Sequence, residues 1–276
     1  MSAAHRQTTP LMRFALLLGA LLTFLAGVQL FVLTDHTTDW FAWTVDAGSA
    51  ATIIGGFYWT ACVLSYLSWR RRDWVEARVG VPGVTAFLWA TLLTTLVHLD
   101  KFHLSDASLT GEGAAWAWLV IYVVDPVLVT TAWILQSRAP GVDAERSSVL
   151  SPWYRRTLTG TGALFLVVGV MMMAAPSVVI GRAPFPLTDL TSRAIGSWVI
   201  AMGGGYLMMA WENDRDRVWP AAVASVVAPI LFAAGTLRYR DEFTWDAAGW
   251  SYLVALGFLA ALGATGLGIG SRDAGS

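Results

Sequence analysis

The amino-acid sequence predicts an all-α, polytopic membrane protein with eight transmembrane helices. Of its 276 residues, 56% are hydrophobic and only 13% are charged, about half the charged share of an ordinary soluble domain. The apolar residues fall into eight blocks of about 20, the length that a helix needs to cross a hydrocarbon core. Lipid offers an exposed backbone no hydrogen-bond partner, and the blocks lack the alternation of barrel strands, so helices are expected.

The predicted spans cover residues 12–33, 48–69, 79–99, 114–137, 157–180, 192–211, 218–237 and 248–270. The first span follows Arg6 and Arg13. It is too long for the apolar core of a signal peptide and no small-x-small cleavage site follows it, which favours a retained helix. Residues 1–137 are predicted to form a first four-helix half, residues 138–156 a polar cytoplasmic linker, and residues 157–276 a second half.

Loop charge predicts the orientation. One side of the predicted bundle carries 13 of the 18 basic residues, and the positive-inside rule therefore places both termini in the cytoplasm (N-in and C-in). The other side carries Lys101, Arg182, Arg193, Arg238 and Arg240. That outer side is otherwise acidic and aromatic.

The two halves echo one another. Residues 96–103 (LVHLDKFH) close the third span, and residues 237–244 (LRYRDEFT) close the seventh at an offset of 141 residues. Further matching pairs are Arg13 and Arg156, Gly27 and Gly169, and Trp116 and Trp250. Four spans per half predict two parallel repeats related by an axis along the membrane normal. Chance similarity among apolar helices is the alternative.

Small residues recur every fourth position in two spans and are typical of close helix contacts in lipid. They are Gly48, Thr52, Gly56 and Thr60 in the second span, and Ser197, Ala201 and Gly205 in the sixth. Since both spans hold the same place in their halves, we expect them to pack centrally. A contact between the two spans is one arrangement that fits this pattern, and tight packing on other helices is the alternative.

Asp125 is the costliest residue for a membrane helix, because it lies in mid-span beside Pro126. A carboxylate there costs about 2.5–3.5 kcal/mol on insertion scales. The proline leaves the carbonyl near Tyr122 without its helical donor and favours a kink. Asp125 and Tyr122 are therefore the candidates for a transport path or a proton-binding site. The structural alternative is a protonated acid that bonds to a neighbouring helix or to the freed backbone.

A second candidate is an outer-face polar cluster made of His98, Asp100, His103, Arg238 and Asp241. Histidine titrates near neutral pH, which suits proton transfer, but the spacing matches no metal signature, so no metal is expected. The structural alternatives are histidines bonded to loop carbonyls and an outer ion-pair collar, in which the charges of residues 238–242 pair with Asp100 and Lys101 and lock the halves together.

Several classes of protein are disfavoured. No basic patch suits nucleic acid, and the spans lack the paired histidines of a membrane haem protein. Phosphate-loop, nucleophile-elbow and zinc-protease motifs are missing from the sequence. A lone cysteine, Cys62, permits neither an internal disulfide nor a cysteine metal cluster. We therefore expect no cofactor.

The segments FAWT (41–44), GGFYW (55–59) and RRDW (71–74), together with residues 96–103, resemble a group of uncharacterised eight-span membrane proteins of actinobacteria. The resemblance implies eight spans and a bacterial plasma membrane as the location. It implies no activity, cofactor or functional residue.

Three classes of function stay open. The favoured one is a small-solute or proton-linked transporter with Asp125 in the path. The first alternative is a non-catalytic membrane scaffold or partner subunit that binds another membrane protein or a second copy of the chain. The second alternative is an outer-face membrane enzyme that uses His98, Asp100 and His103, although no catalytic motif supports one. In every case the lipid bilayer is the expected surrounding.

Overall fold

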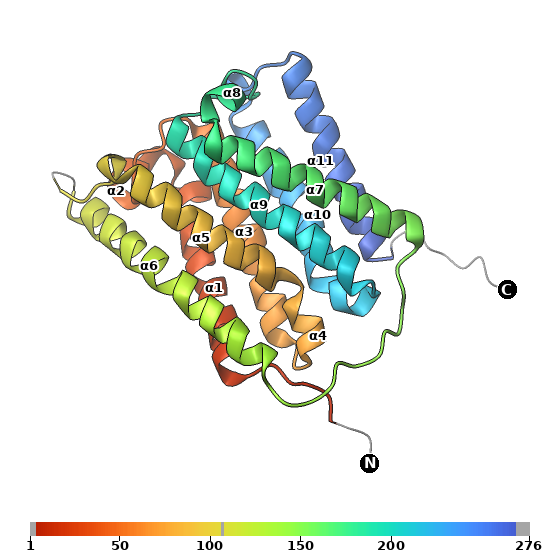
Figure 1. The fold of residues 1–276 in the computed structure, drawn as a ribbon. Coiled ribbons are helices and arrows are strands. Elements are labelled where there is room, and N and C mark those ends of the chain that lie inside the picture. The colour runs from red at the N-terminus through yellow and green to blue at the C-terminus, as the bar shows by residue number, and fades with distance from the viewer. Residues whose placement is uncertain (1–3, 106–107, 269–276) are drawn as a thin grey trace.

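The computed structural model describes residues 4–105 and 108–268 and builds them almost wholly from helices. Figure 1 shows the long helices side by side, with the N-terminus at the lower end of the bundle. Eight helices of the described part are long and apolar enough to cross a membrane, as predicted. They are Pro10–Val32 (α1 with η1), Gly48–Arg70 (α3), Trp74–Val97 (α4, η3 and α5), Leu109–Ser137 (α6), Pro152–Ala174 (α7), Asp189–Glu212 (α9), Arg215–Arg238 (α10) and Ala247–Gly266 (α11).

Short helical turns lie between the long helices. Helix α1 proper is Pro10–Gly27, and the π-helical turn η1 is Val28–Val32. The third span divides into α4 (Trp74–Ala77), η3 (Arg78–Gly80) and α5 (Val81–Val97). The other turns are η2 (Thr34–His36), α2 (Thr37–Trp40), η4 (Leu99–Lys101), α8 (Pro176–Ile180) and η5 (Arg240–Glu242).

Polar caps explain why several helices begin earlier than their apolar blocks. Helix α6 begins after Ser108, whose hydroxyl accepts a hydrogen bond from the N–H of Gly111 at 3.1 Å. Helix α10 begins after Asp214, whose carboxylate accepts from the N–H groups of Asp216 and Arg217. Such caps satisfy the free N–H groups of the first turn. They lie outside the hydropathy signal, so the predicted starts come a few residues late.

The predicted fifth span, 157–180, is too long at its outer end. Helix α7 ends at Ala174, and Pro176 opens the separate turn α8. Proline disfavours a helical conformation in the residue before it, and Ala175 indeed leaves the helical region, with φ −138° and ψ 63°. The predicted end of the last span, at residue 270, lies outside the described residues.

Direct pairing of the second and sixth spans is not the main packing. Helix α3 packs between α1 and α10, whereas α9 packs between α7 and α5. The predicted stripes mark close approaches at some positions and not at others. Gly56 faces Phe232 of α10, and the backbone at Ala201 faces Gly83 of α5, but a Cβ at Gly205 would meet nothing within 4 Å. The two spans meet only through larger side chains, as where Trp198 of α9 lies edge-on to Tyr58 of α3.

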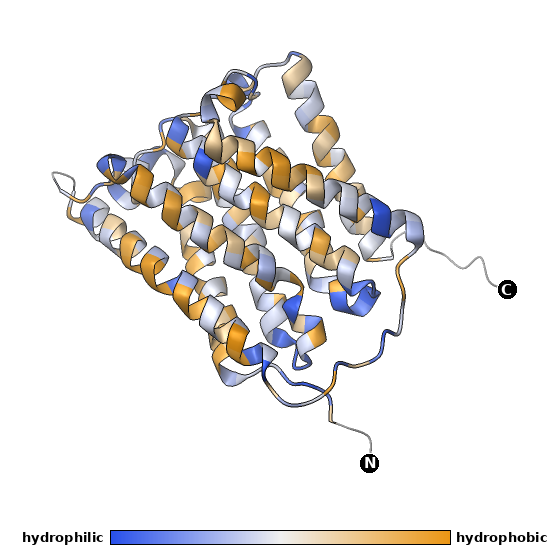
Figure 2. Ribbon diagram, in the orientation of Figure 1, coloured by the Kyte–Doolittle hydropathy of each residue, from blue (hydrophilic) through white to orange (hydrophobic). Residues whose placement is uncertain are grey.

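The apolar surface fits a multi-pass membrane protein. Figure 2 shows hydrophobic residues along α5, α6 and α7 and hydrophilic residues near the helix ends. Large apolar side chains such as Leu164, Ile230 and Val254 are exposed. The core holds an aromatic cluster between α3, α5, α6 and α9, which comprises Phe57, Tyr58, Phe87, Trp118, Tyr122 and Trp198.

The close contact of α7 with α9 predicts a strong effect of one methyl group. A Cβ at Gly203 would lie 2.9 Å from the carbonyl oxygen of Gly162, so Gly203→Ala forces the helices apart. We expect a loss of about 1–3 kcal/mol, measured as a lower melting temperature in detergent. The matched control is Gly205→Ala on the same helix, where a Cβ meets nothing within 4 Å. Equal melting temperatures for the two variants would contradict this packing.

Candidate functional site

A cavity of about 230 Å³ lies between α1, α3, α5 and α6. Its wall on α1 runs from Met12 to Gln29, almost the full length of that helix. Most of its lining is apolar, with a few hydroxyl groups such as those of Thr23 and Ser65. The cavity therefore extends through much of the depth of the predicted membrane.

Asp125 lines this cavity from α6 and is only 9% exposed. Helix α6 continues through Pro126 without a break. Among the described residues, none forms a hydrogen bond or ion pair with the Asp125 carboxyl group. The bond expected of a purely structural aspartic acid is therefore not found. A buried polar group without a partner is costly. The carboxyl group can therefore be stabilised by a hydrogen-bond or charge partner that enters the cavity.

Tyr122 lies one turn before Asp125, on the same side of α6, and also lines the cavity. Its hydroxyl group lies 2.7 Å from the hydroxyl group of Tyr58 on α3. One hydrogen bond between two hydroxyl groups uses one of their two hydrogens. The second hydrogen stays available to an acceptor in the cavity. The two predicted candidates, Asp125 and Tyr122, are thus brought together, and Tyr58 is a third residue that the sequence did not single out.

The cavity lies on the α6 side because α6 packs less closely than α11. Gly263 and Gly266 of α11 let that helix approach α10, since a Cβ at either position would come within 2.8 Å of the atoms of α10. Helix α6 has no glycine after Gly113. It lies along α5 and α1 (Figure 1). The space left behind α6 becomes the cavity.

A smaller cavity of about 80 Å³ adjoins the first between α3, α5, α9 and α10. The two share Ala61, Leu64, Gly80, Val84 and Trp198 in their linings. These residues lie between the two cavities.

The two outer histidines are held by different parts of the protein. Nε2 of His98 accepts a hydrogen bond from Arg193 of α9 at 2.7 Å. His103 lies with Nδ1 3.1 Å from the carbonyl oxygen of Phe41 and Nε2 3.0 Å from the hydroxyl group of Thr44. Within the described ranges, no group of three or more His, Cys, Asp or Glu side chains could hold a metal ion. The histidines therefore do not share a site.

Burial lowers the pKa of the His98 imidazole, and the nearby Arg193 charge lowers it further. The hydrogen bond also favours the neutral imidazole, because an arginine can only donate and therefore requires an unprotonated Nε2. His98 is thus a neutral acceptor at the C-terminal end of α5. It holds α5 to α9.

The outer charges do not form the expected collar. Asp100 pairs with its neighbour Lys101 at 3.2 Å, and Asp241 pairs with its neighbour Arg240 at 3.7 Å. All four side chains are well exposed, so these pairs contribute little. Arg238 donates instead to the carbonyl oxygen of Phe31 at 2.7 Å.

Glu242 is a further connection between the predicted halves at this end, beside the contacts of His98 with Arg193 and of Arg238 with Phe31. Its carboxylate accepts hydrogen bonds from the N–H groups of Gly48 and Ser49, at 3.2 and 2.9 Å, and from the Ser49 hydroxyl group at 2.5 Å. A carboxylate at a helix N-terminus satisfies free N–H groups and complements the helix dipole. A residue of the second half thus caps α3 of the first.

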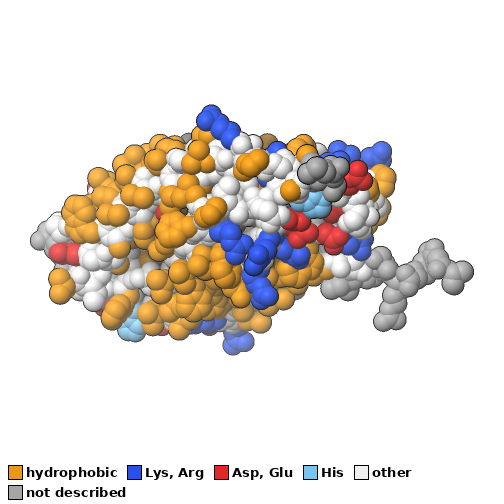
Figure 3. Space-filling view, turned by 90° about the horizontal axis from the view of Figure 1, so that it is seen from below, with side chains coloured by type: hydrophobic (Ala, Val, Ile, Leu, Met, Phe, Trp, Pro, Cys, Tyr) orange, Lys and Arg blue, Asp and Glu red, His pale blue; other side chains and the backbone are white. Residues whose placement is uncertain are grey.

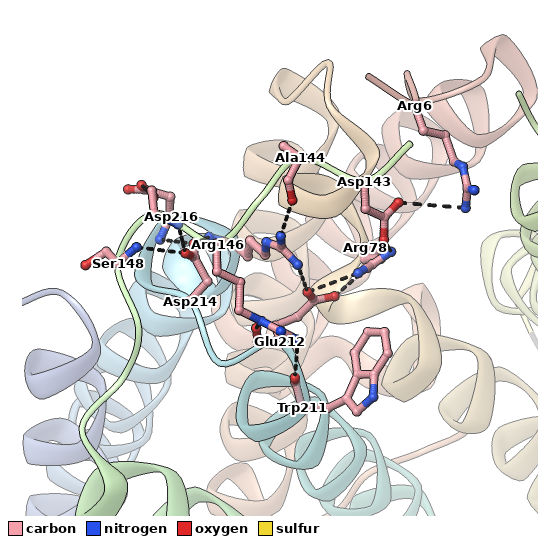
Figure 4. Close-up of polar contacts among 12 residues, drawn as sticks. Arg6, Arg78, Asp143, Ala144, Arg146, Ser148, Trp211, Glu212, Asp214 and Asp216 are labelled. Atoms are coloured by element: carbon pink, nitrogen blue, oxygen red, sulfur yellow. Dashed lines mark hydrogen bonds and ion pairs between the residues drawn. The ribbon is translucent and has the colours of Figure 1, made fainter. Parts of the chain in front are cut away.

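A buried cluster of ion pairs was not predicted from the sequence. Glu212, at the end of α9, is fully buried between the guanidinium groups of Arg78 and Arg217 (Figure 4). Arg78 also pairs with Asp143 of the linker at 2.7 Å. The linker further provides Arg146, which donates to the carbonyl oxygen of Glu212 at 2.7 Å. The Glu212 cluster, made of these five residues, therefore binds the linker to both halves.

Asp214 extends this attachment of the linker. Burial alone would raise the pKa of its carboxyl group, but backbone N–H donors from Ser148, Arg217 and Ser147 outweigh it and hold the pKa below its usual value. Figure 3 views the molecule from this lower end, where Lys and Arg side chains gather beside acidic and His side chains. In the sequence, Arg78, Arg146 and Arg217 indicated only the orientation of the chain in the membrane. The burial of Glu212 could not be predicted, since nothing in the pattern WENDRDR (211–217) distinguishes it from the neighbouring acids.

No family model, no curated protein and no solved structure matches this chain. The resemblance to eight-span actinobacterial proteins therefore stays a prediction. The functional argument depends on the geometry of the site alone.

The Glu212 cluster predicts a large loss of stability on neutralisation. Glu212→Gln keeps the shape but leaves Arg217 and Arg78 buried without their shared carboxylate. Breaking a buried ion pair costs about 3–5 kcal/mol, so the melting temperature in detergent should fall sharply. Asp241→Asn, at an exposed pair, is the control and should leave it unchanged. Equal melting temperatures for the two variants would show that the cluster does not stabilise the fold.

His98 predicts acid sensitivity. Because its pKa is lower in the folded than in the unfolded chain, the unfolded state binds more protons below pH of about 6.5, and stability falls as the pH drops through that range. His98→Gln keeps an acceptor for Arg193 without titrating. Its melting temperature should therefore fall less than that of the wild type between pH 7.5 and 5.5. His36→Gln, at an exposed position, should behave like the wild type; a matching response of both variants would refute the assignment.

Proposed function

We propose that the protein is a proton-linked transporter of a small solute, with Asp125 as the binding group in the path. The single observation that carries the proposal is a buried carboxyl group that has no partner among the described residues and lies on the wall of a cavity between candidate membrane spans. Acids inside transmembrane segments generally mark substrate or proton pathways. The depth of the cavity along α1 and the second cavity beyond Trp198 provide room for a path.

The alternatives have less support. An outer-face enzyme that uses His98, Asp100 and His103 would need these groups in one cleft, yet the histidines bond to different elements and Asp100 is exposed beside Lys101. A scaffold or partner subunit, in contact with another membrane protein or a second copy of the chain, needs no acid in a cavity.

We further infer that the two halves are parallel repeats. Neighbour relations in the first half recur in the second: α1 with α3 and α7 with α9, α3 with α10 and α9 with α5, α5 with α6 and α10 with α11. The turns η4 and η5 follow equivalent helices. The ring of Phe102 packs on Trp43 and Trp118, as the ring of Phe243 packs on Phe185 and Tyr252.

The backbone adds a matching pair of hydrogen bonds: the N–H of His103 donates to Ala42 and that of Thr244 donates to Pro184. The offsets are 141 and 142 residues, as in the sequence echo. The arginine-rich end that carries the Glu212 cluster is then cytoplasmic by the positive-inside rule, with both termini inside. A bacterial plasma membrane is the location that we propose.

Transport predicts a proton flux that depends on Asp125. Purified protein is placed in liposomes that enclose a pH-sensitive dye, and methylamine, octylamine, glycine, glucose, acetate and octanoate are added one at a time. At least one solute should drive proton movement with the wild type. Asp125→Asn should reduce it to the level of empty liposomes while its melting temperature stays high.

Glu112→Gln, which removes an acid from the same helix outside the cavity lining, is the matched control and should retain the flux. A folded Asp125→Asn variant with wild-type flux would overturn the proposal. So would a wild type that moves no protons with any of these solutes.

A further inference from the structure

We propose that the α6 cavity binds a lipophilic organic cation, such as a protonated alkylamine, with its charge at Asp125 and its apolar body along α1. The assignment rests on the proposed function, because it names the ligand class of the same site. Three properties of the cavity carry it: the sign of its charge, its aromatic rings and its long apolar wall.

The charge of the cavity has one sign. Among the described residues of the lining, Asp125 is the one acidic group, and no arginine, lysine or histidine joins it. An anionic ligand would meet a carboxyl group and no compensating cation, which is costly where water is scarce. A cation would instead provide the partner that the protein does not supply to Asp125. The cavity therefore selects against anions.

Aromatic rings line the same cavity as the Asp125 carboxyl group. Trp118, Tyr122 and Asp125 follow one another at helical spacing on one face of α6, and the rings of Trp118 and Tyr122 lie 4.3 Å apart between centroids. Tyr58, Phe87 and Trp198 contribute further rings to the lining from α3, α5 and α9. The π-face of such rings attracts a cation, and more strongly where water is excluded. A carboxyl group among these rings is a site for an organic ammonium rather than for a hydrated metal ion.

The rest of the wall is apolar and elongated. Leu16, Leu22 and Ala26 line it from α1, and Leu128 and Val129 line it from α6. Burial of a hydrocarbon chain here contributes about 0.8 kcal/mol for each CH₂ group removed from water. A small hydrophilic cation would leave this surface without a partner. A cation with an alkyl chain uses both parts of the cavity.

A proton and the organic cation compete for the same carboxyl group. Either one neutralises the buried charge of Asp125, so binding of the cation releases a carboxyl proton to water. The titratable groups that share the lining are Tyr58 on α3 and Tyr122 on α6, and α1 and α5 contribute none. The affinity for the cation should therefore fall as the pH is lowered. This exchange is the coupling that a proton-linked transporter requires.

The test is equilibrium binding of three radiolabelled octyl compounds to the full-length protein in nanodiscs, with binding to empty nanodiscs subtracted. Octylamine is cationic, octanol is neutral and octanoate is anionic, and all three share one chain. We expect saturable binding of octylamine, with octanol and octanoate weaker by roughly tenfold or more, since a charged hydrogen-bond partner contributes about 1.5–3 kcal/mol. Octylamine binding should also weaken from pH 8 to pH 6.

Asp125→Asn should lose the preference for octylamine, whereas Glu112→Gln should keep it. Octanoate binding as tight as octylamine, or octylamine binding that Asp125→Asn leaves unchanged, would overturn the ligand class. Binding without flux in liposomes would leave the ligand class standing and refute the transporter. Flux of another solute without octylamine binding would refute the ligand class and leave the transporter standing.

Discussion

A buried charge in a membrane protein must be neutralised by a partner, because neither lipid nor packed side chains can replace water. Glu212 obeys this constraint through Arg78 and Arg217, and the linker is held in place as a result. Glu242, which is half-buried at the opposite end, accepts hydrogen bonds from the N–H groups that begin α3. Asp125 has no such partner within the described chain. This exception locates the candidate site.

Helix packing explains why the exception has room for a ligand. In lipid, helices associate through close approach of small residues, since there is no hydrophobic force between them. Gly203 of α9, which faces α7, and the glycines of α11 provide such approaches on one side of the molecule. Helix α6 lacks them beyond Gly113 and presents Trp118, Tyr122 and Asp125 instead. Loose packing and polar chemistry thus occur on the same helix.

The helices could be predicted from the sequence because apolar block length depends on membrane thickness alone. Asp125 could be singled out because the free-energy cost of a carboxylate inside an apolar block is evident from the neighbouring residues alone. The Glu212 cluster could not, since the burial of Glu212 depends on Arg78, which lies 134 residues away, and a terminal acid in a charged loop has no distinguishing pattern. The partners of α3 and α9 stayed open for the same reason: small-residue stripes show that a helix has a close neighbour but not which one.

The central claim is that two buried acids differ, with Glu212 neutralised by the protein and Asp125 open to the cavity. Dicyclohexylcarbodiimide, an apolar reagent that modifies protonated carboxyl groups reached from the membrane, tests this difference in the intact protein. Peptide mass spectrometry should find the adduct on Asp125 and not on Glu212, with octylamine protecting Asp125. Modification of Glu212 as readily as Asp125, or an unmodified Asp125, would contradict the account.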